Sequence, residues 1–143
     1  MSEWQDFGYE GMAAKINRLA GSGSINCGIR NYLEPKDPVN TILTPRESIA
    51  CVQAGMDAGT PFRYGTIGRS DDSYVFTAIV RSSVGEMWTI KYDYMIDGSD
   101  NHHFIKQCSA ARITYPAMAF DGISCTTVTA QQWLQDIPEQ RKP

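Results

Sequence analysis

The stretch from Ile96 to Phe104, IDGSDNHHF, gathers the residue types best suited to metal binding or acid–base chemistry. It holds two carboxylates, Asp97 and Asp100, and the only histidines of the chain, His102 and His103. Imidazole and carboxylate groups are ligands for divalent metals, and an imidazole beside a carboxylate can move protons near neutral pH. The same residues also suit the polar tip of a β-hairpin, because Asp-Gly favours a tight turn.

The spacing of these residues disfavours a metal site. A calcium loop that began at Asp97 would need an acid at its twelfth position, and that position is Cys108. Neighbouring residues of an extended chain point to opposite faces, so His102 and His103 could not both bind one ion unless the backbone bends. We therefore expect no metal and no cofactor, and interpret the stretch as a hairpin tip that meets a partner.

Nucleophilic catalysis has one candidate. Cys27 in NCGI could pair with His102 or His103, provided that Cys27 forms no disulfide. The sequence has no G-x-S-x-G, no H-E-x-x-H, no P-loop and no local signature of a cysteine protease. We therefore expect a protein without catalytic activity, and keep a small cysteine/histidine-dependent hydrolase as the alternative.

A second polar turn follows the first predicted strand, in GRSDDS. Polar loops on a rigid scaffold are a common way for small domains to bind or inhibit enzymes. The residues expected to contact a partner are Asp97, Asp100, His102, His103, Arg69, Asp71 and Asp72. If the histidines take part, replacing both should weaken binding and leave thermal stability nearly unchanged.

Composition narrows the function classes. The 143 residues carry 13 Lys and Arg against 16 Asp and Glu, for a net charge of −3, and the basic residues form no run. Nucleic-acid binding depends on a concentrated basic surface, so we do not expect it. No apolar run approaches the roughly 20 residues that span a bilayer. The first residues, MSEWQDFGYEG, lack the pattern of a signal peptide, so the chain is either cytoplasmic or an exported protein without its signal.

The four cysteines favour export. They are well separated and show neither C-x-x-C nor zinc-type spacing with histidine. An even number of dispersed cysteines is typical of a secreted or periplasmic domain with two disulfides, although four reduced cysteines in a core would look the same. Three pairings are possible, and the most local one is preferred: Cys27–Cys51 with Cys108–Cys125.

Two helices should precede the strands. Apolar residues recur at helical spacing over residues 5–20, and Gly21 then favours a stop. A second helix should begin at the N-cap Thr44, with a capping box completed by Glu47, and end at Gly59. On that helix Ile49, Val52 and Met56 form one apolar stripe, which Ala50, Ala54 and Ala58 should widen. Residues 27–43 are expected to be a long irregular connection, and a short helix should follow Thr129.

Between residues 62 and 128 the pattern changes to the two-residue period of strands. Strands are expected at 62–67, 73–82, 86–96, 102–115 and 122–128, with a bulge near residues 109–111. The second of them is apolar on both faces and should be central. In the third, Trp88, Ile90, Tyr92, Tyr94 and Ile96 share one face. We expect this stripe in the core, or in an adhesive patch if the helices leave it open.

These elements predict a single α+β domain over residues 1–143, with residues 1–4 and 138–143 frayed. Its architecture would be a four- to five-stranded antiparallel meander packed against the N-terminal helices, with a short C-terminal helix. Such a domain is similar in architecture, by analogy only, to cystatin-like folds. The function expected is that of an exported, disulfide-stabilised domain that binds a protein, for example as an inhibitor or immunity-type protein. A structural accessory protein of the cell envelope is a further alternative.

Overall fold

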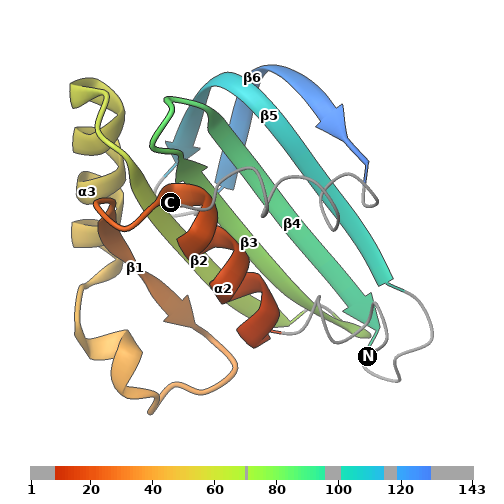
Figure 1. The fold of residues 1–143 in the computed structure, drawn as a ribbon. Helices are drawn as coiled ribbons and strands as arrows, with labels where there is room; N and C mark the ends of the chain where they lie inside the picture. The colour runs from red at the N-terminus through yellow and green to blue at the C-terminus, as the bar shows by residue number, and fades with distance from the viewer. Residues whose placement is uncertain (1–8, 70, 96–100, 115–118, 130–143) are drawn as a thin grey trace.

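A computed structural model describes residues 9–69, 71–95, 101–114 and 119–129 of the chain (Figure 1). The predicted C-terminal helix, the frayed ends, Asp97 and Asp100 lie outside these residues. The helices and strands are α2 (Tyr9–Ala20), β1 (Ile25–Asn31), the 3-10 helix η1 (Pro38–Thr41), α3 (Pro45–Ala58), β2 (Phe62–Arg69), β3 (Ser73–Arg81), β4 (Met87–Met95), β5 (Asn101–Thr114) and β6 (Ala119–Val128).

The strands form one mixed sheet in the order β1-β2-β3-β4-β5-β6. β1 and β2 are parallel and are joined through α3, whereas every later pair is antiparallel. The α+β class is thus confirmed, but the predicted all-antiparallel meander of four or five strands is wrong. The likeness to cystatin-like folds is correspondingly only rough.

The strand missing from the prediction is β1, which occupies part of the expected irregular connection. Its Gly28 has a φ of 100°, and its pairing with β2 shifts register between Asn26 and Ile29. A bulge of this kind breaks the alternation of inward and outward side chains. Sequence periodicity therefore gave no strand signal there.

The ends of helix α3 agree with the prediction from the sequence, whereas the residues that it buries agree only in part. Thr44 and Glu47 form the predicted capping box, and Gly59 ends the helix in the left-handed conformation at a φ of 67°. Ser48, Val52 and Gly55 are its buried residues. The expected widening by alanines is wrong, because Ala50, Ala54 and Ala58 are exposed.

Each face of the sheet has its own core. On one face α2 packs Ile16, Leu19 and Ala20 against a cluster that includes Ile67, Phe76, Val80, Ile90 and Ile105. On the other face Val52 of α3 packs with Cys27, Phe62, Tyr64, Ile79 and Met87. Figure 1 shows α2 lying across the front of the sheet, and α3 beside β1 and β2.

The central strands match their prediction. β3 lies between β2 and β4 and contributes to both cores, as its two apolar faces indicated. Trp88 and Tyr92 on β4 are 2% and 0% exposed. The alternative in which these two rings form an adhesive surface patch is therefore wrong.

Candidate functional site

The two polar turns predicted to contact a partner leave the sheet at the same end. Arg69, Tyr74, Tyr94 and Asn101 are consecutive register partners across β2, β3, β4 and β5. Neighbouring strands lie about 4.8 Å apart, so this row places the end of β2 within about 15 Å of the start of β5. The sequence suggested two separate protrusions, and the sheet instead brings their bases together.

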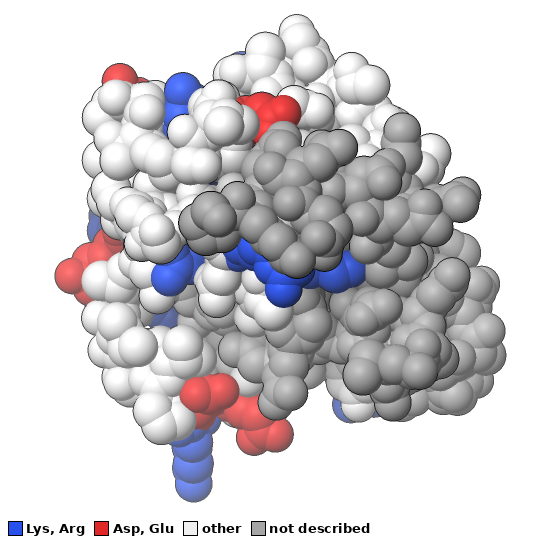
Figure 2. Space-filling view, viewed as in Figure 1, with Lys and Arg blue, Asp and Glu red and all other residues white. Residues whose placement is uncertain are grey.

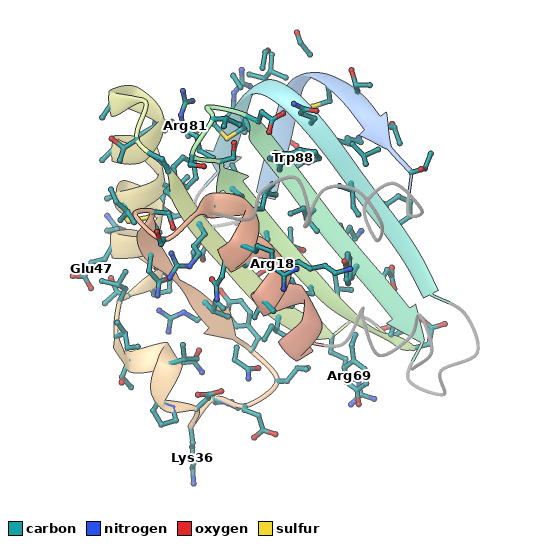
Figure 3. The ribbon with its side chains drawn as sticks, in the orientation of Figure 1. Arg18, Lys36, Glu47, Arg69, Arg81 and Trp88 are labelled. Carbon is teal, nitrogen blue, oxygen red and sulfur yellow. A yellow bond between two sulfur atoms is a disulfide. The ribbon has the colours of Figure 1, made fainter. Side chains whose placement is uncertain are left out.

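The turn between β2 and β3 presents its charges to solvent. Arg69, Asp71 and Asp72 are all exposed. Figure 3 shows Arg69 at the lower end of the view, the end at which Lys36 also projects. In Figure 2 acidic and basic side chains occur together at this lower end.

The histidines lie in strand β5, which begins at Asn101, one residue before the predicted start. In the ladder His102 is opposite Asp93, and His103 is opposite Tyr92. This placement describes their backbone; the side chains of both histidines, together with Asp97 and Asp100, lie outside the description. Their part in partner binding stays a prediction.

A third connection reaches this end of the sheet, and sequence reasoning missed it. The Tyr32 amide donates a hydrogen bond of 2.8 Å to the carbonyl of Ile67, next to the end of β2. The Tyr32 side chain is 51% exposed. Because this segment was interpreted as an irregular connection, nothing in the sequence placed Tyr32 beside the β2–β3 turn.

Side chains hold the connection that follows Tyr32 in one shape. The Asn31 amide donates to Asn40 Oδ1 at 2.7 Å, and Asn40 Nδ2 donates back to the Asn31 carbonyl at 2.8 Å. The Arg30 guanidinium donates to the carbonyls of Asn40 and Leu43. Asp37 caps η1 by accepting from the Val39 amide at 3.0 Å. In the sequence, Asn31 and Asn40 flank the two prolines of this segment, and this pattern could have indicated an ordered loop.

Both predicted disulfides are present. Cys27 bonds to Cys51, and Cys108 bonds to Cys125. Because Cys27 is in a disulfide, it cannot act as a thiolate. It is also 0% exposed, so it cannot contact a substrate. The hydrolase alternative needed Cys27 unpaired, and the structure holds Cys27 in a disulfide.

The part of the sheet that α3 does not cover holds a pocket of about 290 Å³. Sequence reasoning did not identify it. Thr89 and Lys91 alternate with the buried Trp88 and Ile90. This alternation predicted that Thr89 and Lys91 lie on the other face of the strand, but it did not predict a pocket on that face. The lining residues are Thr77, Thr89, Ile90, Lys91, Phe104, Lys106, Asp121 and Gly122.

Comparisons with known proteins add no relative: the chain matches no protein-family model, no curated protein and no solved structure. Within the described residues, no group of three or more His, Cys, Asp or Glu side chains could hold a metal ion. None of the helices in the described part of the chain is long and apolar enough to span a membrane.

Proposed function

We propose that this protein is an exported, non-catalytic domain that binds another protein through one end of its sheet. That end, here called the turn end, consists of Arg69, Asp71 and Asp72 in the β2–β3 turn, the start of β5 and the connection after Tyr32. The observation that carries the proposal is the register row from Arg69 to Asn101, which brings the bases of the two polar turns to the same end of the sheet. An enzyme that the domain inhibits or protects against is the most specific form of partner.

The size of the turn end suits this role. A standard protein interface buries about 800 Å² on each partner, which corresponds to a patch about 28 Å across. Four strands account for about 15 Å of that width, and the connection after Tyr32 extends it beyond β2. Tyr and Arg are among the residue types that contribute most to binding energy, and Tyr32 and Arg69 are both exposed here.

The charges at the turn end favour a partner with a basic surface. Asp71 and Asp72 are adjacent and exposed, and the chain as a whole carries a net charge of −3. Complementary charge raises the rate of encounter and orients the partner. Two disulfides support export, because such bonds persist in oxidising compartments such as the periplasm or the cell exterior.

Affinity capture with matched baits tests the proposal. The wild-type domain, an Asp71→Asn/Asp72→Asn variant and an Asp57→Asn variant would each be immobilised and exposed to an extract of the source organism. Asp57 is an exposed acid near the C-terminal end of α3 and accepts a hydrogen bond from Gln53 at 3.0 Å, so it controls for loss of an acidic charge. We expect one protein to be retained by the wild type and by Asp57→Asn, and lost from the double variant.

Equal retention by all three baits would overturn the assignment to the turn end. If no protein bound the wild type in preference to a blank support, the proposal of a binding domain would itself fail. Circular dichroism of each bait, measured before capture, shows whether the variants are folded.

A further inference from the structure

The pocket is made by a hairpin that folds back over the sheet. On the face away from α2, Ala111 near the end of β5 packs against the core beneath α3. β6 also contacts β4, although β5 lies between them in the sheet order. In Figure 1 the end of β5 and the start of β6 pass behind the upper ends of the neighbouring strands. The β5–β6 hairpin thus gives an otherwise open sheet face a side wall.

A disulfide and a glycine set the position of that wall. Cys108 and Cys125 are register partners on β5 and β6, and their bond crosses the base of the hairpin. Gly122 lies so close to the bond that a Cβ atom there would overlap both sulfur atoms. Pairing is interrupted between Cys108 and Ala110, where Ser124 has a φ of 54°, and then resumes in the same register. The predicted irregularity is therefore a local bend without an inserted residue.

The floor of the pocket consists of two cross-strand rows. Thr77, Lys91 and Phe104 are register partners across β3, β4 and β5. Thr89 and Lys106 form the next row, and Asp121 and Gly122 form the wall. Lys91 and Lys106 are diagonal neighbours in these rows. Diagonal neighbours lie about 7–8 Å apart, which is within reach of two long side chains, so both lysines can reach one bound group.

The chemistry of the lining favours an anion attached to a flat apolar group. Two ammonium groups and two hydroxyls face one carboxylate, in a chain that is acidic as a whole. Lys106 is exposed and lines the pocket, so its ammonium group can reach a bound ligand. Phe104 is 50% exposed, and Lys91 Nζ lies 5.7 Å from the centre of its ring. An aromatic ring exposed beside cations is suited to hold a second ring.

We propose that this pocket binds a small organic anion. Lys91, Lys106 and the hydroxyls of Thr77 and Thr89 bind its carboxylate, and its flat apolar group packs against Phe104. Asp121 disfavours a ligand that carries several negative charges. A volume of about 290 Å³ lies just below the usual range for small-molecule sites, roughly 300–1,000 Å³, which limits the ligand to about one ring. The site lies on the sheet face and does not depend on partner binding at the turn end.

Titration followed by amide NMR shifts tests this site with four small probes. Benzoate carries both the ring and the carboxylate, acetate the carboxylate alone, benzyl alcohol the ring alone, and benzylammonium the ring with opposite charge. We expect benzoate to give saturable shifts at Thr77, Thr89, Lys91 and Lys106, with a dissociation constant on the order of 1 mM. The other three probes should bind at least about tenfold more weakly, because each loses the ring contact or the charge-assisted hydrogen bonds.

Variants assign the effect to the lysines. Lys91→Gln/Lys106→Gln should weaken benzoate binding about tenfold. Lys36→Gln removes another exposed lysine, in the connection after Tyr32, and should leave binding unchanged. Because all of these side chains are exposed, both variants should fold, and their amide spectra will show it. Unsaturated shifts with benzoate, equal binding of benzylammonium, or equal binding by both variants would overturn the proposal.

Discussion

The two disulfides lie in halves of the sheet that are built differently. Cys27–Cys51 joins β1 to α3 inside the core of the parallel, helix-covered half. Cys108–Cys125 joins neighbouring strands of the antiparallel half, and Cys125 is exposed. The bonds enclose similar lengths of chain, with sequence separations of 24 and 17, so loop entropy alone would make each worth about 3 kcal/mol.

The difference therefore lies in what each bond positions. The first fixes a helix on a sheet and supports the scaffold. The second fixes the hairpin that forms the wall of the pocket. From this contrast we infer that the covered half provides most of the stability, whereas the open half and the turn end present the binding surfaces.

Removing each disulfide separately should give the largest changes in stability and should distinguish the role of one bond from that of the other. Cys27→Ala/Cys51→Ala should lower the free energy of unfolding by about 3–5 kcal/mol, because it loses both the loop constraint and buried packing. Cys108→Ala/Cys125→Ala should lower it by about 2–3 kcal/mol and also weaken benzoate binding. Urea unfolding of both variants measures the first quantity, and the NMR titration measures the second. A larger loss of benzoate affinity in the Cys27/Cys51 variant would contradict the division of roles.

A smaller change in stability should result from replacing a glycine in the covered half, and its size should differ between Gly55 and Gly68. A Cβ at Gly55 would lie 2.6 Å from Cδ2 of Phe62, whose side chain is fully buried, whereas a Cβ at Gly68 would have no neighbour within 4 Å. Gly55→Ala should therefore destabilise the domain by about 1–3 kcal/mol, despite the better helix propensity of alanine. Gly68→Ala should change stability by no more than about 0.5 kcal/mol. Equal melting temperatures for the two variants would show that α3 is not packed this closely on β2.

The smallest effect concerns the cap of α3 and depends on pH. Hydrogen bonds from the backbone amide and the side chain of Thr44 hold the pKa of the Glu47 carboxyl below its usual value. A lowered pKa means that this stabilisation is present above the pKa of the unfolded chain and is lost as the pH falls through the folded one. Glu47→Gln keeps the capping box but not the charge. Its unfolding free energy should be slightly below that of the wild type at neutral pH and converge with it in acid; a constant difference would contradict this account.

Local rules predicted most of the elements. The ends of α3 follow from Thr44, Glu47 and Gly59, each of which acts within a few residues along the chain. The alternation around Trp88 and Ile90 gave the inward face of β4. The most local pairing of the cysteines was also the one formed. In each case the information lies within one element or one short loop.

Features that depend on distant segments could not be predicted. β1 pairs with residues more than thirty positions later, and its bulge at Gly28 hides its periodicity. The pocket requires Asp121 to approach Thr77 and Lys91 from a folded hairpin, which no pattern within one strand indicates. Likewise the closeness of the polar turns follows from the strand order and the register of the sheet.

Hydrogen–deuterium exchange of the domain, alone and bound to its captured partner, tests partner binding at the turn end most directly. We expect added protection in residues 69–74 and 101–104 and in the connection after Tyr32, because the partner would cover these amides or restrict their opening. Residues 53–59 at the far end of α3 should exchange at the same rate in both states. Protection of that end of α3, with no change at residues 69–74, would contradict the proposed binding surface.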